Sequence, residues 1–559
     1  DRGSNAAATR INSSGLIEKY RENLLTYSND FSQWVSINTT ETGGQTGHDG
    51  SSDAWLLTKS TSDGRVYKTT SSSGVQVYSI YAKANNSNWI YLRADYSGGI
   101  ASGFFDLVNG VGGSFNNIID SNITSVGNGW YRIQIAFDKT ITLVRVYPAE
   151  GNNNTSGTTG SILIQSAQLE TGLVATEYLN STSVTGKAGV LVDLPRINYD
   201  ANGENGSLLL EPSRQQLIQF SEYFGSSDWM KTRTTVNANQ LVSPDGNLNA
   251  YKLSETADSG FHAISINTSV VNGTTYNVSV FAKKGSSNFI QLLFGPTNIV
   301  SGNPYANFDL NEGTFQNNGI SSVKIENYGN GWYRCSGTIT ISGGTTLTYY
   351  LAKVNSLSAT RASSFGGNVN NNVYLFGAMA EPNATYATSY IPNHSGTGGV
   401  TRAADLCNGG GSAESINSTE GVLYAEMAAL VNGGENRVIT ISDGSYDNSV
   451  RIQLYTNTNE IEMRIVVGNA IQALERVAIT NTLNFNKIAV KYKVNDFQLW
   501  INGSKLRFDT SGTMPSANTF NVLNFDDGDG NNDFYGNVKQ VAVFNEALTN
   551  AELATLTTL

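Results

Sequence analysis

The chain has 559 residues, and its 35 Lys and Arg against 46 Asp and Glu give a formal net charge of −11. This acidic balance, without a run rich in Lys or Arg, argues against nucleic acid as a partner, because phosphate binding needs clustered positive charge. No stretch of about eighteen consecutive apolar residues occurs, so we expect no membrane insertion. Abundant Gly, Ser, Thr and Asn are typical of short strands joined by many turns.

The N-terminal segment, residues 1–22, is predicted to be a linker. Its first residues, "DRGSNAAATR", contain no apolar core of a signal peptide and no initiating Met, which we interpret as a cut inside a longer polypeptide. Two later segments, residues 181–213 and 394–420, resemble this one and are punctuated by Gly, Asn and Pro. Such punctuation predicts ordered linkers with short extended pieces.

Two copies of one domain are predicted between these linkers, at residues 23–180 and 214–393. The clearest paired stretch is "GNGWYR", at residues 127–132 and again at 329–334. Other pairs are "YAKANNSNWIYL" with "FAKKGSSNFIQL", "DGSSDAWLL" with "DGNLNAYKL", and "AQLETGLVATEYL" with "AMAEPNATYATSYI". The spacing between paired stretches varies, so the copies differ by loop insertions. A duplication of this length predicts two similar domains rather than a short-period solenoid.

The repeated "GNGWYR" predicts a tight hairpin followed by a strand. Asn128-Gly129 and Asn330-Gly331 favour a type I′ turn, because both central residues of that turn need positive φ. Alternation along the following strands places Tyr131 and its counterpart Tyr333 on the core face.

Trp130 and Arg132 in the first copy, and Trp332 and Arg334 in the second, fall on the opposite face of these strands. In one hypothesis each Trp is a stacking platform for a sugar on an open sheet, and each Arg bonds to sugar hydroxyls. In the other hypothesis a loop or a linker covers the Trp, which then only closes the sandwich. Because Trp is usually well buried, we favour packing and keep these four as candidate ligand-binding residues.

The sequence changes character in the third predicted domain, residues 421–559. "VRIQLYTNTNEIEMRIVV" and "KIAVKYKVNDFQLWINGSKL" each predict a β-hairpin. Trp500 lies on the face opposite the apolar residues of its strand, which makes it a further candidate for ligand binding. At the C-terminal end, Thr549 and Glu552 form a capping box, which predicts one short helix.

A glycine-rich acidic loop, "NFDDGDGNNDFYG", is the candidate metal site. Asp527, Asp529, Asn531 and Asp533 fall at alternating positions and supply the oxygen ligands that Ca²⁺ prefers. The loop lacks the bidentate Glu that closes an EF-hand, because Val538 stands at that position. Calcium binding and a merely polar turn are therefore both open hypotheses.

The sequence contains no recognisable catalytic pattern. Its three His residues have no His, Glu or Cys at zinc-ligand spacing, and it carries no nucleophile elbow and no phosphate-binding loop. Glu460 and Glu462 share one strand face but lack the further acids of the glucanase pattern, so we interpret them as part of a solvated face. We therefore expect a protein that is not an enzyme.

Two family resemblances add to this interpretation. Residues 422–559 resemble the laminin-G-like, concanavalin A-type lectin sandwich through "KIAVKYKVNDFQLWINGSKL" and "FYGNVKQVAVFNEALTNAELATL". The two copies are similar to jelly-roll carbohydrate-binding modules of bacteriophage tail and virion proteins through "ENLLTYSNDFSQW", "YAK", "FDL", "GNGWYR" and "AQLETG". The linkers also look like connectors of phage tail proteins. The second copy departs from the pattern at "AMAEPNATYATSYI".

The resemblance implies an all-β fold of three β-sandwich or jelly-roll domains in tandem, with extended linkers and one short C-terminal helix. It also implies a virion or extracellular protein that binds a host polysaccharide or cell-surface glycan, contacts other tail proteins, and forms a homo-oligomer. Calcium is seen at some laminin-G-like sites, which favours Ca²⁺ at the acidic loop. A purely structural or decoration role in a tail fibre is the main alternative, and a polysaccharide depolymerase is a less favoured one.

Overall fold

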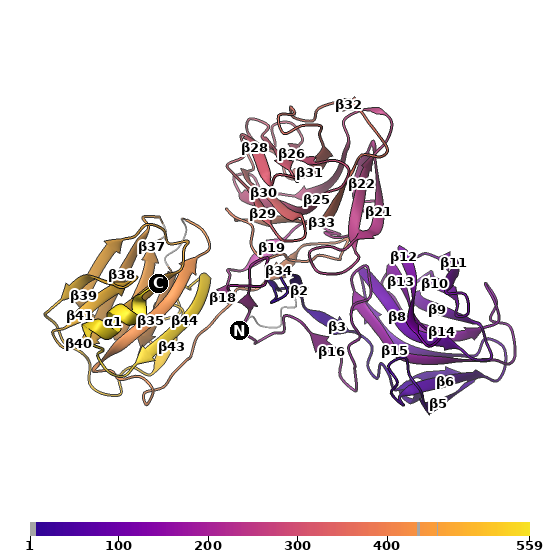
Figure 1. The fold of residues 1–559 in the computed structure, drawn as a ribbon, viewed down its shortest axis with the longest axis horizontal. Coiled ribbons are helices and arrows are strands. Elements are labelled where there is room, and N and C mark those ends of the chain that lie inside the picture. Colours follow the sequence, from indigo (N-terminus) through magenta and orange to yellow (C-terminus); the bar gives the residue numbers. More distant parts are fainter. Residues whose placement is uncertain (1–6, 433–436, 456) are drawn as a thin grey trace.

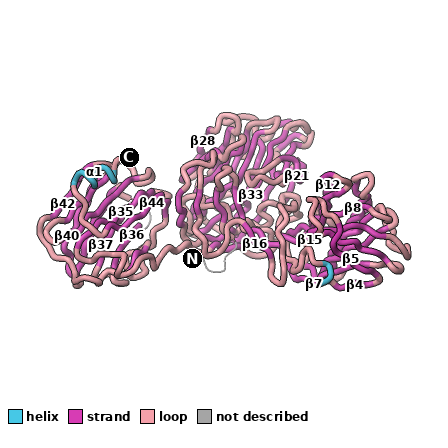
Figure 2. The backbone as a smooth tube through the Cα atoms, turned by 60° about the horizontal axis from the view of Figure 1, so that its bottom comes forward, coloured by secondary structure: helices cyan, strands magenta, loops and turns pink. Residues whose placement is uncertain are grey.

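The computed structural model describes residues 7–432, 437–455 and 457–559. These residues form three β-sandwiches, and the connecting segments meet between them (Figure 1). Strands fill all three lobes, whereas the helix found among the described residues is confined to the 3-10 turn η1 (Phe31–Gln33) and the terminal helix α1 (Asn550–Thr557) (Figure 2). The predicted all-β fold with one short C-terminal helix is confirmed. Among the described helices, none has the length and apolarity needed to cross a membrane.

The first sandwich consists of two six-stranded antiparallel sheets. One sheet has the order β12 (Asp120–Gly127), β13 (Trp130–Asp138), β8 (Val75–Ala84), β15 (Ser161–Thr171), β6 (Ala54–Lys59) and β5 (Thr39–Gln45). The other has the order β11 (Val111–Asn116), β10 (Gly99–Asp106), β9 (Trp89–Tyr96), β14 (Ile141–Ala149), β7 (Arg65–Ser72) and β4 (Val35–Ile37).

The second sandwich repeats this strand order. Its first sheet consists of β29 (Ser322–Asn327), β30 (Trp332–Thr340), β25 (Thr275–Lys284), β33 (Asn372–Pro382), β22 (Ala250–Glu255) and β21 (Thr234–Leu241). Its second sheet consists of β28 (Thr314–Asn318), β27 (Tyr305–Asp309), β26 (Phe289–Gly295), β31 (Thr346–Lys353), β24 (Ala263–Ser269) and β20 (Met230–Thr232). The short strands β23 (Ser259–Gly260) and β32 (Phe365–Gly366) pair separately. The repeated sequence therefore folds into repeated topology.

The third sandwich packs a seven-stranded sheet against a five-stranded one. The larger sheet has the order β17 (Ile197–Asn198), β18 (Ser207–Leu210), β44 (Gly536–Phe544), β35 (Glu420–Ala429), β40 (Asn486–Lys493), β41 (Phe497–Ile501) and β42 (Ser504–Asp509). The smaller has the order β39 (Ala470–Ala478), β38 (Glu460–Val467), β37 (Ser449–Tyr455), β36 (Arg437–Ser442) and β43 (Val522–Asn524). Helix α1 begins at the predicted capping box, in which Thr549 and Glu552 bond reciprocally.

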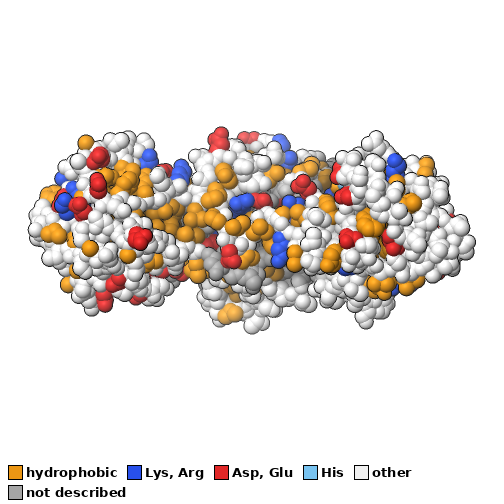
Figure 3. Space-filling view, turned by 90° about the horizontal axis from the view of Figure 1, so that it is seen from below, with side chains coloured by type: hydrophobic (Ala, Val, Ile, Leu, Met, Phe, Trp, Pro, Cys, Tyr) orange, Lys and Arg blue, Asp and Glu red, His pale blue; other side chains and the backbone are white. Residues whose placement is uncertain are grey.

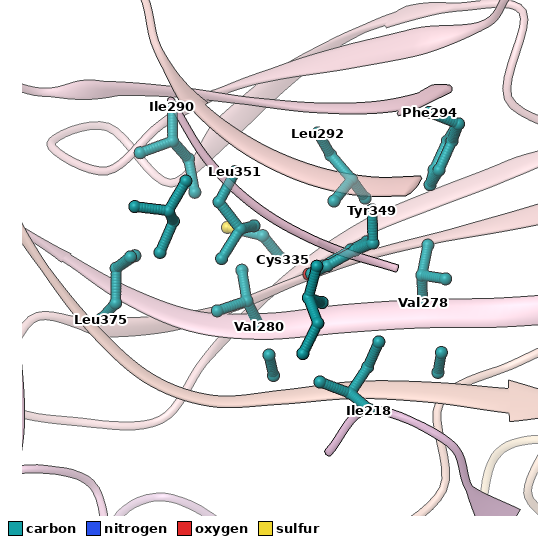
Figure 4. Close-up of a cluster of buried hydrophobic side chains, with 14 of the residues drawn as sticks. Ile218, Val278, Val280, Ile290, Leu292, Phe294, Cys335, Tyr349, Leu351 and Leu375 are labelled. Atoms are coloured by element: carbon teal, nitrogen blue, oxygen red, sulfur yellow. The ribbon is translucent and has the colours of Figure 1, made fainter. Parts of the chain in front are cut away.

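Alternating apolar residues build a separate core in each sandwich. In the second sandwich, Val278 and Val280 of β25 point toward Leu292 and Leu351 of the facing sheet (Figure 4). Because successive residues of a strand point to opposite sides, the intervening residues Asn277, Ser279 and Phe281 face away from this core. The tight turns follow the expected chemistry, since Asn128-Gly129 and Asn330-Gly331 all have positive φ.

The connecting segments are ordered and pair with strands far away in the sequence. The N-terminal hairpin of β1 (Thr9–Ile11) and β2 (Ile17–Lys19) precedes the first sandwich but packs on the second, where Ile17 donates its N–H to the Pro244 carbonyl. The next hairpin, β17 and β18, precedes the second sandwich but extends the sheet of the third through β44. Further pairs join β3 (Arg21–Asn23) to β16 (Gly186–Ala188) and β19 (Arg214–Gln216) to β34 (Val400–Arg402).

A buried ionic network holds the connecting segments together. The Glu211 carboxylate lies 2.7 Å from a guanidinium nitrogen of Arg196 and 2.7 Å from one of Arg402, and Arg196 also pairs with Asp405. All four residues are at most 5% exposed. Burial alone would raise the pKa of Glu211, but Arg402 and Arg196 lower it to about 2. The network therefore contains a charged carboxylate at neutral pH.

Replacing Glu211 by Gln is expected to destabilise the protein by about 3–5 kcal/mol, because it removes the carboxylate that pairs with buried Arg402 and leaves buried Arg196 with Asp405 alone. Chemical denaturation measures this change. The matched control is Glu18→Gln, which breaks the ion pair between Glu18 and Arg10. Because both side chains are 26% exposed, this substitution should lower the stability by about 1 kcal/mol or less. Equal losses in the two variants would contradict the role of the network.

The same network predicts acid sensitivity. The folded-state pKa of Glu211 is about 2 against an ordinary value of 4.5, so its contribution to stability is fully present above pH 4.5 and is lost as the pH falls toward 2. Denaturation midpoints measured between about pH 7 and pH 2 should fall more steeply in the wild type than in Glu211→Gln. Parallel pH profiles would show that Glu211 does not titrate in this way.

Candidate functional site

Trp130 and Trp332 occupy matching positions, the first residues of β13 and β30, and both are buried. Trp130 is 2% exposed and meets the His48 ring edge-on, with 6.4 Å between ring centroids. Trp332 is 1% exposed, packs with Ile17 of the N-terminal hairpin, and donates its indole N–H to the Val242 carbonyl at 3.0 Å. These contacts correct the hypothesis of open stacking platforms, because a loop in one copy and a connecting segment in the other cover the rings.

The outward face of the first sandwich nevertheless carries polar and aromatic side chains beside Trp130. The first row across four strands consists of Thr124, Arg132, Tyr81 and Gln165. The second row consists of Asn122, Gln134, Ser79 and Gln168. Asn122 and Thr124 are exposed, and Arg132 and Tyr81 are half-buried. We call the eight residues of these two rows the polar face.

Tyr81 lies at the centre of the polar face. The guanidinium carbon of Arg132 lies 5.3 Å from its ring centroid, and the His48 ring stacks on it with 3.8 Å between centroids. A ring nitrogen of His48 lies 2.7 Å from the Gln165 side-chain oxygen, and the Gln165 amide group donates to Asp53 at 2.5 Å. A loop and three strands therefore hold one aromatic ring and several hydrogen-bonding groups in fixed positions.

The same face of the second sandwich is apolar and covered. Its two rows consist of Glu326, Arg334, Phe281 and Phe376, then Lys324, Ser336, Ser279 and Met379. Phe281, Phe376 and Met379 are at most 1% exposed and pack with Ile17 of the N-terminal hairpin. Lys19 of that hairpin pairs with Glu222 at 2.6 Å and Asp245 at 2.7 Å. Only a cavity of about 220 Å³ remains beside Arg334, which is itself 1% exposed.

One buried carboxylate is common to both copies. Glu170 accepts hydrogen bonds from the Thr176 N–H and hydroxyl at 2.8 and 2.6 Å, and Glu381 accepts the same two bonds from Thr388. Burial raises the pKa of both carboxyl groups. Because the arrangement is the same on the covered face, we assign Glu170 a structural role in holding the following segment against the sheet.

Trp500 is also buried, which corrects its assignment as a ligand candidate. It is 6% exposed and lies in one cluster with Leu553 of α1 and Leu548 just before this helix. Its indole N–H donates to the Gln498 side chain at 2.8 Å. The predicted terminal helix is what covers it, since α1 contacts β41 directly.

The acidic loop does not gather its oxygens into a metal site. Asp527 accepts from the Asn531 N–H at 3.1 Å, Asp529 from the Asn531 amide at 2.8 Å, and Asp533 from the Tyr535 hydroxyl at 2.8 Å. Burial raises the pKa of Asp527, and a hydrogen bond with Asp529 raises it further. Within the described ranges, no three His, Cys, Asp or Glu residues lie close enough together to hold a metal ion. Calcium binding by these residues stays a prediction that this arrangement does not support.

Glu462, interpreted from sequence as part of a solvated face, is buried instead. Its carboxylate lies 2.9 Å from Arg464 and 2.7 Å from Arg476, and the Tyr455 hydroxyl donates to it at 3.2 Å. Tyr455 and Arg476 also stack, with 3.8 Å between the guanidinium carbon and the ring centroid. This carboxylate therefore belongs to an ion network rather than to a pair of acids facing a substrate.

Two cavities lie where no sequence signal indicated them. A crevice of about 830 Å³ separates the N-terminal hairpin from the first two sandwiches and is lined by Lys19, His394 and several carboxylates. An apolar groove of about 410 Å³, lined by Leu208, Cys407 and Phe525 among others, borders the third sandwich. Hydrophobic side chains gather along the junction between this sandwich and the centre of the molecule (Figure 3). The residues that line each cavity come from segments far apart in the sequence, so no local sequence pattern predicts either cavity.

Known proteins show limited similarity to the chain. No protein-family model matches it, and no curated protein does. Among solved structures, the CBM40 module of the Ruminococcus gnavus IT-sialidase is 16% identical, with a TM-score of 0.24, over 27% of this chain and 95% of that one. The CBM22-1-CBM22-2 tandem of Paenibacillus barcinonensis Xyn10C is 12% identical, with a TM-score of 0.22, over 69% of this chain and 100% of that one.

Domains LG4-5 of the mouse laminin alpha1 chain are 10% identical to this chain, with a TM-score of 0.19, over 62% of this chain and 96% of that one. The similar solved structures are thus carbohydrate-binding modules and laminin G domains. All three TM-scores are low, so the architecture rests on the strand order and register of this chain alone.

Replacing Trp332 by Ala is expected to destabilise the protein by about 3–5 kcal/mol, because the substitution empties a packed site beneath the N-terminal hairpin. Denaturant unfolding measures the loss. Phe508→Ala is the control, since Phe508 is 59% exposed on the third sandwich and should change stability by less than about 0.5 kcal/mol. Unchanged stability of Trp332→Ala would show that the indole is not a packing element.

Proposed function

We propose that this protein is a non-enzymatic surface protein of a bacteriophage tail or virion, which attaches to host-surface glycans through the polar face of its first sandwich. The observation that carries the proposal is the difference between the two copies. At matching positions, Phe281 and Arg334 are at most 1% exposed beneath a connecting segment, whereas Tyr81 and Arg132 are half-buried.

The chemistry of the polar face suits a saccharide. Sugars present a C–H face that packs on an aromatic ring, and a rim of hydroxyls that needs donors and acceptors fixed in place. Tyr81 supplies a half-buried ring that already carries His48 on one face, while Asn122, Thr124 and Arg132 supply hydrogen-bonding groups at neighbouring positions. Gln134 is 9% exposed and holds the neighbouring loop by accepting the Ala175 N–H at 2.9 Å.

The setting on a virion is supported by the resemblance of both copies and of the connecting segments to modules of phage tail proteins. Attachment of this kind uses many copies, because weak binding at single sites is multiplied when several sites engage one surface. The proposal therefore includes a homo-oligomer and contacts with other tail proteins, with host polysaccharide as the ligand and a location outside the host cell.

A structural role in a tail fibre is the second candidate, and the buried network around Glu211 favours it. Four paired charges that are at most 5% exposed hold the connecting segments together, as a rigid spacer requires. The two roles are compatible, because a rigid spacer can also present a binding face. Polysaccharide degradation is less favoured, since Glu462 is engaged by Arg464 and Arg476.

Replacing Tyr81 by Ala in the full-length protein is expected to weaken glycan binding by about ten- to hundredfold, because the stacking surface is lost. A glycan array followed by calorimetry on the best saccharide, and binding to host cells, measure the effect. Phe508→Ala removes an exposed aromatic ring from the third sandwich and should bind as the wild type does.

The outcomes separate the three roles. Absence of any glycan or host-cell binding by the full-length protein would reject adhesion and leave the structural role. Release of reducing ends from host polysaccharide would instead establish degradation. If Tyr81→Ala binds glycan as tightly as the wild type, the binding site does not lie on the polar face.

A further inference from the structure

Two arginines at matching positions have very different partners. Arg334 in the second sandwich is 1% exposed, and its side chain donates to the Thr388 carbonyl at 2.5 Å and to the Ser279 hydroxyl at 3.1 and 3.3 Å. Burial lowers the pKa of Arg334, but Tyr328, Glu381 and Glu326 together raise it above its ordinary value. The hydrogen-bonding capacity and the charge of Arg334 are thus largely used inside the fold.

Arg132 in the first sandwich has counterparts of only a few of the partners that surround Arg334. It donates to the Ser79 hydroxyl at 3.3 Å, which matches the Ser279 bond, and it lies over Tyr81 as Arg334 lies over Phe281. Its Nε is buried and has no hydrogen-bond partner among the described residues. The side chain is half-buried, so part of it remains accessible to a ligand.

The sequence difference between the copies explains the loss of partners. Thr124 stands opposite Arg132 on the neighbouring strand, where Glu326 stands opposite Arg334. Val126 replaces Tyr328 at the position four residues before the Trp of each copy. The first copy has therefore lost an acid and a phenol hydroxyl beside an arginine that it retains.

The carboxylates near Arg132 are engaged elsewhere. Glu170 accepts from Thr176 and from the Gln168 amide at 2.6 Å, and Asp53 accepts from Gln165 and Ser51. Against the larger effect of burial, Arg132 still lowers the pKa of Glu170, but the acid at the Glu326 position is missing, and a partly desolvated guanidinium group can donate two parallel hydrogen bonds to a further carboxylate. The group that would complete this site is therefore an anion from outside the protein.

We propose that the glycan bound by the first sandwich is an acidic saccharide, and that Arg132 binds its carboxylate while Tyr81 packs on the sugar ring. This inference rests on the proposed function, because it names the class of ligand for the same face. The proposed contact with the ligand carboxylate belongs to the first sandwich alone. Arg334, the matching arginine of the second sandwich, is covered by the N-terminal hairpin and donates to Thr388.

The test uses the full-length protein and pairs of oligosaccharides that differ only at C6, glucuronate-containing chains against their carboxyl-reduced glucose counterparts. Host polysaccharide before and after carboxyl reduction forms a second pair. The acidic member of each pair should bind about ten- to hundredfold more tightly, and Arg132→Met should abolish this difference. Arg132→Lys, which keeps the charge but not the planar fork, should retain part of it. Arg507→Met is the control for net charge, since Arg507 lies on the third sandwich with a side chain 45% exposed.

Each outcome decides between the two proposals. Equal binding of acidic and reduced saccharides, with Tyr81 still required, would overturn the acidic ligand and leave glycan binding in place. A preference for the acidic member that Arg132→Met does not change would overturn the assignment to Arg132. Absence of binding to every saccharide and to host cells would reject the proposed function itself. Circular dichroism and the denaturation midpoint of Arg132→Met distinguish loss of the contact from loss of the fold.

Discussion

Burial of the paired charges Arg196, Glu211, Arg402 and Asp405 is the constraint on which the arrangement of the three sandwiches depends. A charge in the protein interior is tolerated only with its partner, so the connecting segments cannot separate without exposing or stranding four ionised groups. Arg196 also donates to the Thr9 carbonyl, which ties the N-terminal hairpin to the same centre. The segments predicted from sequence as ordered linkers are therefore part of the folded structure and decide which faces remain accessible.

The duplication shows how accessibility changes the use of one face. Both copies keep a buried Trp, an Arg over an aromatic ring, and a Glu held by a Thr at matching positions. Beneath the N-terminal hairpin the neighbouring residues are Phe and Met, and in the first copy they are Tyr and Gln, of which Tyr81 is half-buried while Gln165 and Gln168 are at most 1% exposed. The retained Trp and Glu are thus scaffold, whereas the aromatic residue beside the Arg is Phe where the hairpin buries it and Tyr where it is half-buried.

Much of the fold follows from local patterns in the sequence. Asn128-Gly129 has the positive φ values of its predicted turn, and Thr549 and Glu552 form the predicted capping box. The site does not follow in this way. The burial of Trp332 depends on Ile17, which is distant in sequence, and the acidic loop satisfies its carboxylates with the side chains of Asn531 and Tyr535. Contacts between distant segments and side-chain hydrogen bonds produce no periodic pattern in the sequence, so they could not be predicted from it.

Each connecting hairpin skips the sandwich that follows it in the sequence and docks on the one after that. The duplicated sequence unit is therefore not the unit that can be expressed as a stable fragment. Residues 214–393 hold all strands of the second sandwich, yet without residues 7–19 they would present Phe281, Phe376 and Met379 to water as a contiguous apolar surface. Such surfaces promote aggregation. Trimming this protein at its repeat boundaries would therefore yield insoluble fragments, whereas cuts that keep each hairpin with its distant partner would preserve soluble pieces.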